Sequence, residues 1–372
     1  MNSNIKSNAM SDKKYIPNLD SLRGLAAIFV VVSHFEQLKS YIKIPHLSNW
    51  PVLGSIAVSI FFMLGGLLST YFFVKEKLKN DTINYAQFFS KRYIRIWPLY
   101  FVILIISFFI WPAHMSMFNF FLCLFLMSNV AFSMYGLNVV IDPIWTLGAE
   151  DQFYLIHPQL FRLKNFSKIF VTFIVLIVIY ITIRIGIVHF TNAPNAIKLF
   201  LERTRFDNLL LGGTIALMFY GFQNKIQIPT IIQEKLIIHP VTQTISVSLF
   251  IIYILYSTCI NTHFYSDLVI VSLLLPIIYN LAFNANCMIN IENKWLNFIG
   301  KISFSLYLSH KMIIYGILQI VNKKILYSFF KENPYQHLLL YPVVLAVTIF
   351  AAWLIYEFVE KKVLILKEKI KP

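Results

Sequence analysis

The sequence predicts an all-α integral membrane protein with about ten transmembrane helices. Of its 372 residues, 58% are hydrophobic and only 13% are charged, whereas a soluble domain carries about 25% charged residues. Apolar runs recur along the whole chain, and most of them approach the roughly 20 residues that a helix needs to cross a bilayer. These spans would use most of the chain and leave little for a separate soluble domain.

The candidate spans follow one another with short connections. They lie at residues 20–38, 52–74, 98–115, 118–134, 166–189, 206–221, 240–258, 264–284, 298–320 and 338–358. The runs at 118–134 and 206–221 are short, so tilted or re-entrant segments are alternatives for both. We assign residues 1–17 to an N-terminal tail, residues 18–360 to one transmembrane domain and residues 361–372 to a basic C-terminal tail.

The distribution of Lys and Arg predicts which side of the membrane each connection faces. One set of alternate connections, together with both termini, holds 22 of the 32 Lys and Arg residues, and the other 10 lie on the opposite side. Cytoplasmic loops carry the excess of these residues, so we expect both termini in the cytoplasm and an even number of spans. The net charge of +15 is explained by this orientation and by contact with membrane lipids, and we expect no nucleic-acid partner.

The composition also argues against a metal centre. The cysteines Cys123, Cys259 and Cys287 lie in or beside apolar stretches without the spacing of metal ligands. We therefore expect neither a metal site nor a disulfide framework. Since charged residues are scarce, the few ionisable groups within the spans form a short list of functional candidates.

The first span carries two ionisable residues on one face. Arg23 and His34 are eleven positions apart, which gives a net rotation of about 20° and a rise of roughly 16 Å along an α-helix. Arg23 is therefore expected at the cytoplasmic interface and His34 near the middle of the bilayer. An ionisable residue at that depth is a functional candidate by default. The alternatives are an interfacial anchor for Arg23 and a neutral imidazole hydrogen-bonded between helices for His34.

The most basic internal segment, residues 75–97, precedes the third span. Arg92 and Arg95 are three positions apart and flanked by aromatic residues, so they share one face of a helix. They lead into a span that Pro98 can begin, because proline is favoured in the first helical turn. Two interpretations stay open, namely a site for an anionic cytoplasmic ligand and anchoring against anionic lipids.

Glu150 is the second candidate in an apolar environment. It lies between Pro143 and Pro158, and Trp145 and Tyr154 are among the aromatic residues around it. If it is buried, its carboxylate could orient an imidazole and stabilise the protonated form, as the acid of a catalytic triad does. The alternative is a loop carboxylate in water.

Several motifs in the expected order resemble the acyltransferase-3 family of integral membrane acyltransferases, which O-acylate bacterial surface glycans and some small molecules. The matching segments are Arg23 to His34, Arg92 to Pro98, Trp145 to Pro158, Arg205 to Gly212, Gly300 to His310, and Tyr356 to Glu360. Each motif alone is a weak signal, but together they are specific, and they cover about residues 15–362. The chain departs from the pattern at Lys91, where an arginine is usual, and at His157, where a tryptophan is common.

The resemblance implies an acyl-CoA donor, most often acetyl-CoA, and a sugar hydroxyl of a surface or lipid-linked glycan as acceptor. The donor phosphates would be bound through charge-assisted hydrogen bonds by three arginines, Arg23, Arg92 and Arg95. His34 would act as the general base on the acceptor hydroxyl, with Glu150 orienting its imidazole. An acyl-enzyme intermediate on His34 is a less direct alternative.

Four residues are our candidates for binding the acceptor, and they are Trp145, Tyr154, Arg205 and Asp207. For Arg205 and Asp207, a salt-bridge cluster at the membrane interface is the alternative. The resemblance also implies the bacterial inner membrane, and we expect a stand-alone form without the extracytoplasmic hydrolase-like domain of some relatives. The sequence does not indicate an oligomeric state.

Two other classes compete with an enzyme. A transporter or flippase for a glycan or a small anionic solute would also use a polytopic body with a buried histidine, and a lipid-binding sensor would need no chemistry. Many transporters show related halves with interrupted spans, and we find no such pairing in this sequence.

Overall fold

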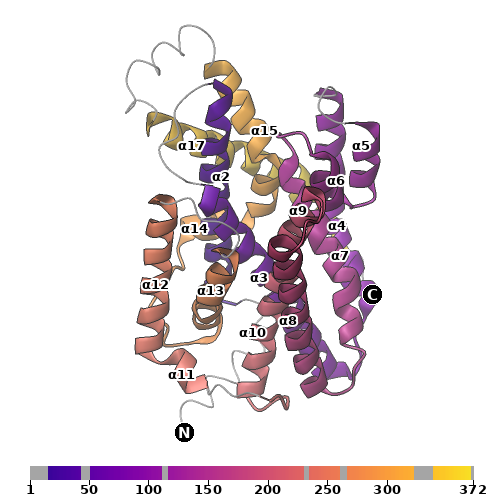
Figure 1. Cartoon of the computed structure of the whole chain (residues 1–372), viewed down its shortest axis with the longest axis vertical. Coiled ribbons are helices and arrows are strands. Elements are labelled where there is room, and N and C mark those ends of the chain that lie inside the picture. The colour runs from indigo at the N-terminus through magenta and orange to yellow at the C-terminus, as the bar shows by residue number, and fades with distance from the viewer. Residues whose placement is uncertain are drawn as a thin grey trace.

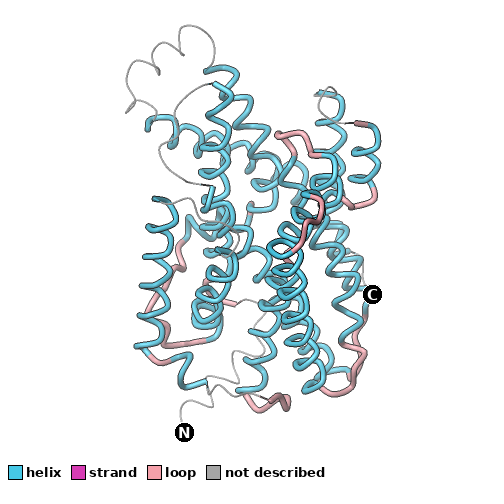
Figure 2. The backbone as a smooth tube through the Cα atoms, in the orientation of Figure 1, coloured by secondary structure: helices cyan, strands magenta, loops and turns pink. Residues whose placement is uncertain are grey.

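The computed structural model describes residues 16–42, 51–110, 116–229, 234–259, 266–321 and 338–369, and within these ranges the chain is helical with no strand (Figures 1 and 2). The elements are α2 (Leu19–Leu38), η1 (Lys39–Ile42), α3 (Pro51–Asn80), α4 (Tyr85–Ile110), α5 (Met117–Leu124), α6 (Ser128–Tyr135), η3 (Asp142–Ile144), α7 (Trp145–Leu160), α8 (Phe166–Phe190), α9 (Asn195–Thr204), α10 (Phe206–Phe222), α11 (Glu234–Ile238), α12 (Pro240–Cys259), α13 (Ser266–Phe283), α14 (Lys294–Lys301), α15 (Ser303–Val321), α17 (Leu340–Ile355), η5 (Tyr356–Glu360) and α18 (Lys361–Lys369). The predicted all-α fold is confirmed.

Six of the described helices are long and apolar enough to cross a membrane, and they are α3, α4, α8, α12, α15 and α17 with its continuation. α13 is also apolar but shorter. α10 is buried along most of its length, as a helix at the centre of a bundle should be. Most of the predicted apolar runs correspond to one helix each, whereas 118–134 covers α5 and α6, 298–320 covers the end of α14 and most of α15, and 338–358 continues from α17 into η5. The total of about ten spans stays a prediction.

Two local expectations are corrected by the structure. The run at 118–134 is not one helix, because Leu126 adopts a left-handed conformation with φ 59° and separates α5 from α6. α4 begins at Tyr85, and Pro98 lies inside it. Proline within a helix removes one backbone hydrogen bond, which membrane helices tolerate where neighbouring groups satisfy the freed carbonyl. As a result, Arg92 and Arg95 belong to the same continuous helix as the apolar span.

α3 packs against both α2 and α10, and α2 also packs against α14. Close backbone contacts set the positions of α3 on α10 and of α2 on α14. A Cβ atom on Gly66 of α3 would lie only 1.8 Å from the carbonyl oxygen of Leu209 on α10. A Cβ atom on Gly24 of α2 would lie 2.2 Å from the carbonyl oxygen of Leu296 on α14. Only glycine permits such an approach, and small residues of this kind hold helices together in membranes. The contacts place α2, with Arg23 and His34, against the core.

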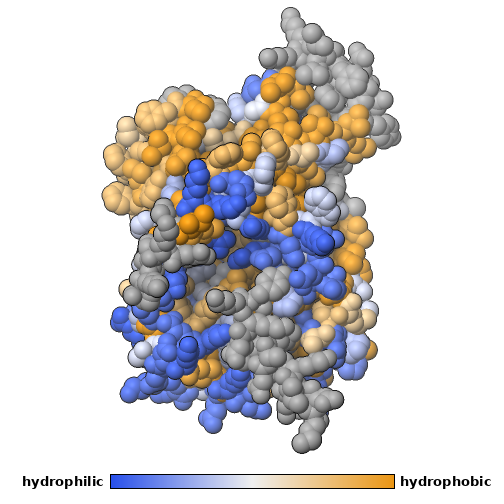
Figure 3. All heavy atoms as spheres, turned by 180° about the vertical axis from the view of Figure 1, so that it is seen from behind, coloured by the Kyte–Doolittle hydropathy of each residue, from blue (hydrophilic) through white to orange (hydrophobic). Residues whose placement is uncertain are grey.

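The outside of the bundle is strongly apolar, as a lipid-facing surface requires. Large exposed hydrophobic side chains recur along α8 and α12, for example Ile179 and Ile252. Viewed from behind, hydrophilic residues gather over the middle and lower parts of the molecule, toward the end where α11 lies (Figure 3). These features identify an integral membrane protein.

The two predicted tails are only partly described. Residues 1–15 of the N-terminal tail lie outside the described ranges. Residues 361–369 of the C-terminal tail form α18, which packs against α4. The side of the membrane that each terminus faces stays a prediction.

Candidate active site

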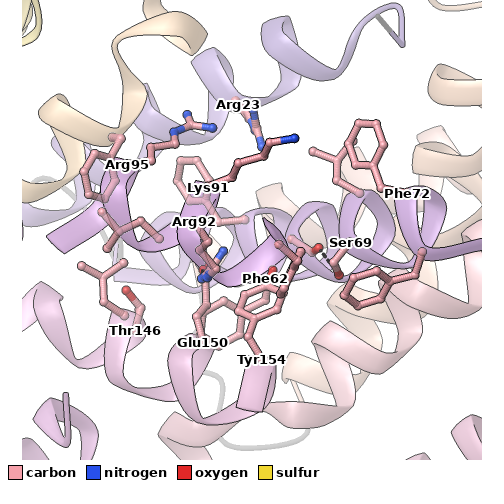
Figure 4. Close-up of a pocket in the computed structure, with 18 of the residues that line it drawn as sticks. Arg23, Phe62, Ser69, Phe72, Lys91, Arg92, Arg95, Thr146, Glu150 and Tyr154 are labelled. Atoms are coloured by element: carbon pink, nitrogen blue, oxygen red, sulfur yellow. Dashed lines mark hydrogen bonds and ion pairs between the residues drawn. The ribbon is translucent and has the colours of Figure 1, made fainter. Parts of the chain in front are cut away.

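A pocket of about 700 Å³ lies among α2, α3, α4, α7 and α15. This volume falls within the range of about 300–1,000 Å³ that is typical of ligand sites. Aromatic side chains form much of the wall, together with two carboxylates and six cations, which are Glu76, Glu150, Arg23, Lys75, Lys79, Lys91, Arg92 and Arg95. Figure 4 shows Arg23, Lys91 and Arg95 on one side of the pocket and Glu150 and Tyr154 on the other. The lining is therefore suited to an anionic ligand with an apolar portion.

The three arginines predicted to bind the donor all line this pocket, but Arg92 is already engaged. Its Nη2 lies 2.7 Å from Oε2 of Glu150, and its Nε lies 3.5 Å from Oδ1 of Asp151. Its guanidinium also stacks over the ring of Tyr154, 3.5 Å from the ring centre. Arg92 is thus held by two carboxylates and an aromatic face, and it joins α4 to α7.

Arg23 and Arg95 keep most of their hydrogen-bonding capacity for a ligand. Arg23 makes a long contact of 3.6 Å with Asp20, and no ion pair of Arg95 occurs within the described ranges. The lysines of the lining add three more charges, of which Lys75 and Lys79 come from the last turns of α3. The sequence had indicated a basic segment here and left open whether it binds lipid or ligand. The structure places these residues in the pocket lining.

The hydrogen-bonding partner of His34 is a second histidine, His310 on α15. Nδ1 of His34 lies 2.7 Å from Nε2 of His310, and the two rings are nearly parallel with centres 4.9 Å apart. Nδ1 of His310 lies 2.7 Å from the carbonyl oxygen of Tyr307. Because a carbonyl oxygen only accepts, a neutral His310 carries its proton on Nδ1, and its Nε2 accepts from the Nδ1–H of His34. Nε2 of His34 is then the nitrogen with the free lone pair.

Tyr307 separates this histidine pair from the pocket. Its ring lines the pocket, and the ring centre lies 5.9 Å from that of His310. Its hydroxyl accepts a hydrogen bond of 2.9 Å from Thr146 and donates one of 3.0 Å to the carbonyl oxygen of Pro143. Neither histidine lines the pocket itself. The basic pocket and the histidine pair are therefore neighbours, and the side chain of Tyr307 contacts both.

The structure gives Glu150 a different partner from the one we predicted. Its carboxylate holds Arg92, and the position beside Nδ1 of His34 is occupied by His310. A signal for His310 was present, because it closes the motif that begins at Gly300. The pattern of one helix does not reveal which other helix it will meet, so His310 received no role from the sequence.

Of the four acceptor candidates, Tyr154 lies in the pocket lining. Its face is occupied by Arg92, so it forms part of the wall rather than an open stacking surface. Trp145 is buried outside this lining and packs edge-on against Phe62, with ring centres 6.2 Å apart.

Arg205 and Asp207 form internal ion pairs instead of lining the pocket. Arg205 pairs with Asp267 of α13 at 3.0 Å, and Asp207 pairs with Arg184 of α8 at 2.8 Å. All four side chains are nearly or fully buried. A buried charge needs such a partner, so these pairs tie the start of α10 to α8 and α13. Both residues thus take part in ion pairs within the bundle, and a role in binding the acceptor stays a prediction.

Two relatives show what kind of protein this chain is similar to. It is 27% identical over 324 residues to the peptidoglycan O-acetyltransferase OatA of Listeria monocytogenes, covering 81% of this chain and 50% of that protein. It is also 27% identical over 325 residues to the O-acetyltransferase OatA of Staphylococcus aureus, covering 82% and 51%. The chain spans about half the length of these curated relatives. No solved structure matches it.

A family profile agrees with the motifs in their order along the chain. The profile describes an acyltransferase domain and matches residues 16–357. This range includes every helix that contributes to the pocket and to the histidine pair. The chain therefore belongs to the acyltransferase-3 family of integral membrane O-acyltransferases.

Proposed function

We propose that this protein transfers an acyl group, most simply acetyl, from acyl-CoA to a sugar hydroxyl of a bacterial cell-wall or surface glycan. The observation that carries the proposal is the basic pocket whose lining includes Tyr307, because the ring of Tyr307 lies 5.9 Å from that of His310, the partner of His34. A long donor with phosphates at one end and a thioester at the other matches this layout. Membership of an acyltransferase family supports the reaction class.

The donor phosphates are bound at the cationic part of the pocket. Arg23 and Arg95 supply charge-assisted hydrogen bonds, and the lysines of the lining add positive charge. Arg92 contributes its charge while its hydrogen bonds stay with Glu150. In this arrangement Glu150 organises the donor pocket instead of the base.

His34 acts as the general base through Nε2. This nitrogen takes the proton of the acceptor hydroxyl, and the hydroxyl oxygen attacks the carbonyl carbon of the thioester. The carbon–sulfur bond then breaks, and the imidazolium returns the proton to the thiolate, which leaves as CoA–SH beside the new ester. General-base assistance contributes about 10²–10⁴ in rate. His310 is a positioning residue, because it accepts the Nδ1–H of His34 and so fixes the tautomer and the ring.

In this proposal the donor pocket faces the cytoplasm. Residues 75–95, which supply the lysines of the lining, lie on the side that holds 22 of the 32 Lys and Arg residues. Both termini share that side, with about ten spans crossing the inner membrane. Because one relative is a peptidoglycan O-acetyltransferase by name, peptidoglycan fragments are the first acceptors to test. The comparisons do not favour a transporter or flippase.

Acetyl transfer by the purified protein in lipid nanodiscs tests the proposal. With [¹⁴C]acetyl-CoA and peptidoglycan fragments, the wild type should label the glycan and release CoA. His34→Ala should lose at least about 100-fold in turnover and still bind acetyl-CoA. The matched control is His239→Ala, which removes an exposed histidine outside the site and should keep full activity.

Two results would contradict the proposal. Full turnover by His34→Ala would remove His34 as the base. Binding of acetyl-CoA by the wild type without transfer to any glycan would refute acyl transfer to a sugar.

A further inference from the structure

The pocket is elongated, and it follows α3 for most of the length of that helix. Its lining includes side chains from every turn of α3 between Val58 and Asn80, a distance of about 33 Å along an α-helix. Near one end of this range, Phe61 packs edge-on against Tyr307, with ring centres 5.8 Å apart. Lys75 is 14 positions further along α3, roughly 21 Å from Phe61. The pocket therefore reaches from the surroundings of Tyr307 to the last turns of α3.

The last turns of α3 extend beyond the apolar part of the bilayer. α3 has 30 residues and a length of about 45 Å, whereas the hydrocarbon core is about 30 Å thick. Its first 24 residues, 51–74, carry no charge, and charged side chains begin at Lys75. Oε1 of Glu76 accepts a hydrogen bond of 2.9 Å from the backbone N–H of Asn84, directly before α4. This end of the pocket is thus a polar mouth beside a short, hydrogen-bonded connection between α3 and α4.

Three lysines line this mouth. Lys75 and Lys79 are one turn apart on α3, and Lys91 comes from α4. Lys75 is half-buried and the other two are exposed. Within the described ranges none of the three forms an ion pair or a side-chain hydrogen bond, whereas Lys77 donates a hydrogen bond of 2.8 Å to a backbone carbonyl at the end of α7. Arg95 is four positions beyond Lys91 on α4, so it lies about 6 Å further from the connection.

The charge of this lysine group matches a terminal phosphate. Together with Glu76, the lysines leave a net charge of two positive units at the mouth. A phosphomonoester carries about −1.5 to −2 at pH 7, and lysine binds phosphate as a compact point charge. A diphosphate within a chain carries one negative charge on each phosphate, which Arg23 and Arg95 can balance. The pocket therefore offers two phosphate sites in series, with the arginines further from the mouth than the lysines.

We propose that Lys75, Lys79 and Lys91 bind the 3′-phosphate of CoA, so that the protein selects donors that carry this phosphate. The inference rests on the proposed function and deepens it, because it names the part of the donor that determines its choice. With the 3′-phosphate at the mouth and the diphosphate at the arginines, the flexible arm of the donor points along α3 toward Phe61 and Tyr307. No bond is made or broken at the 3′-phosphate, so the lysines act on affinity alone.

The test compares the binding of CoA and 3′-dephospho-CoA. The two compounds share the diphosphate, the arm and the thiol, and they differ only in the 3′-phosphate. Isothermal titration calorimetry on the protein in phosphatidylcholine nanodiscs, which contain no anionic lipid, gives the affinity for each. The wild type should bind CoA about tenfold more tightly, because three partly solvated ion pairs each contribute modestly. This preference should shrink as the salt concentration rises.

Charge-removing variants assign the preference to the lysines. The triple variant Lys75→Gln, Lys79→Gln, Lys91→Gln should bind CoA only as tightly as the wild type binds 3′-dephospho-CoA, and its affinity for 3′-dephospho-CoA should not change. The matched control is Lys168→Gln, which removes an exposed lysine of α8 outside the pocket lining and should keep the full preference. Unchanged binding of 3′-dephospho-CoA shows that a variant is folded, and if the triple variant does not fold, the single variants decide.

Three results would overturn the inference. The first is equal binding of the two compounds by the wild type, and the second is a preference that survives in the triple variant. The third is a triple variant that keeps the preference for CoA but no longer retains phosphatidylglycerol during purification, which would assign the lysines to lipid headgroups. Binding of neither compound would refute the proposed donor as well. Because titration requires no acceptor, a failure of acetyl transfer would refute the proposed function and leave a measured preference for the 3′-phosphate standing.

Discussion

The hydrogen bond between His34 and His310 predicts how a change at His310 will affect turnover. In the proposed mechanism His310 itself does not contact the substrate. His310→Phe keeps an aromatic ring of similar size but removes the Nε2 atom that lies 2.7 Å from Nδ1 of His34. His34 then loses the acceptor that fixes its proton on Nδ1. Its imidazole will divide between two tautomers, and in one of them Nε2 carries the proton and cannot act as a base.

The strength of the hydrogen bond between His34 and His310 sets the size of the expected fall in kcat. The imidazolium of His34 exists only during the reaction, so the bond to His310 is strongest in the transition state. A hydrogen bond to a charged group is worth about 1.5–3 kcal/mol, which corresponds to a fall of about 10–150-fold in kcat. This is smaller than the loss of the base itself, about 10²–10⁴. The KM for acetyl-CoA should stay constant, because the arginines of the donor pocket are unchanged.

Steady-state kinetics in nanodiscs check this prediction, with His310→Gln as the matched variant. The amide oxygen of glutamine can take the place of Nε2 and accept the Nδ1–H of His34, so His310→Gln should recover most of the lost kcat. Thermal unfolding of each variant shows whether packing has changed. Wild-type kcat in His310→Phe would refute the positioning role, and equal losses in both folded variants would show that ring packing, not the hydrogen bond, matters.

The remaining predictions concern the pocket and the helix packing. Arg95→Gln should raise the KM for acetyl-CoA about tenfold to hundredfold with little change in kcat, since it removes a donor to phosphate; kinetics at varied acetyl-CoA measure this. Glu150→Gln should also act mainly on that KM, because Glu150 holds Arg92, and a loss of kcat as large as that of the missing base would contradict this role. Gly66→Val should lower the unfolding temperature, because its Cβ would lie 1.8 Å from a carbonyl oxygen of α10, at a cost of at least about 1–3 kcal/mol. Gly186→Val, whose Cβ meets open space, is its control in scanning fluorimetry and should unfold near the wild-type temperature.

The sequence predicts features that depend on one helix or on one face of the membrane. The helical period placed Arg23 and His34 on one stripe, and the acyl-CoA donor implied by the family resemblance led us to group Arg23 with Arg92 and Arg95. The structure brings these three arginines to the same pocket. The all-α fold followed from apolar runs of spanning length, because a helix is one of the few structures that satisfy all of their backbone hydrogen bonds inside a membrane.

Contacts between distant helices could not be predicted in the same way. His34 and His310 are 276 positions apart, and no local pattern indicates that they meet. The same limit applies to Asp207, whose partner Arg184 lies on another helix. A polar side chain at a helix entry has the same sequence pattern whether it pairs internally or binds a substrate. For the break at Leu126, the only signal was the short length of the run 118–134, because a leucine with positive φ is rare.

Tyr307 contributes to the donor pocket through its ring and to the histidine pair through its backbone carbonyl. Its ring belongs to the pocket lining and its centre lies 5.9 Å from that of His310, so in the proposed mechanism the thioester passes this ring to reach Nε2 of His34. Its backbone carbonyl accepts the Nδ1–H of His310 and thereby sets the tautomers of both histidines. The ring turns about side-chain bonds, while the carbonyl is fixed within α15. A donor that displaces the ring from Thr146 and Pro143 will therefore open the passage without disturbing the protons on which the base depends.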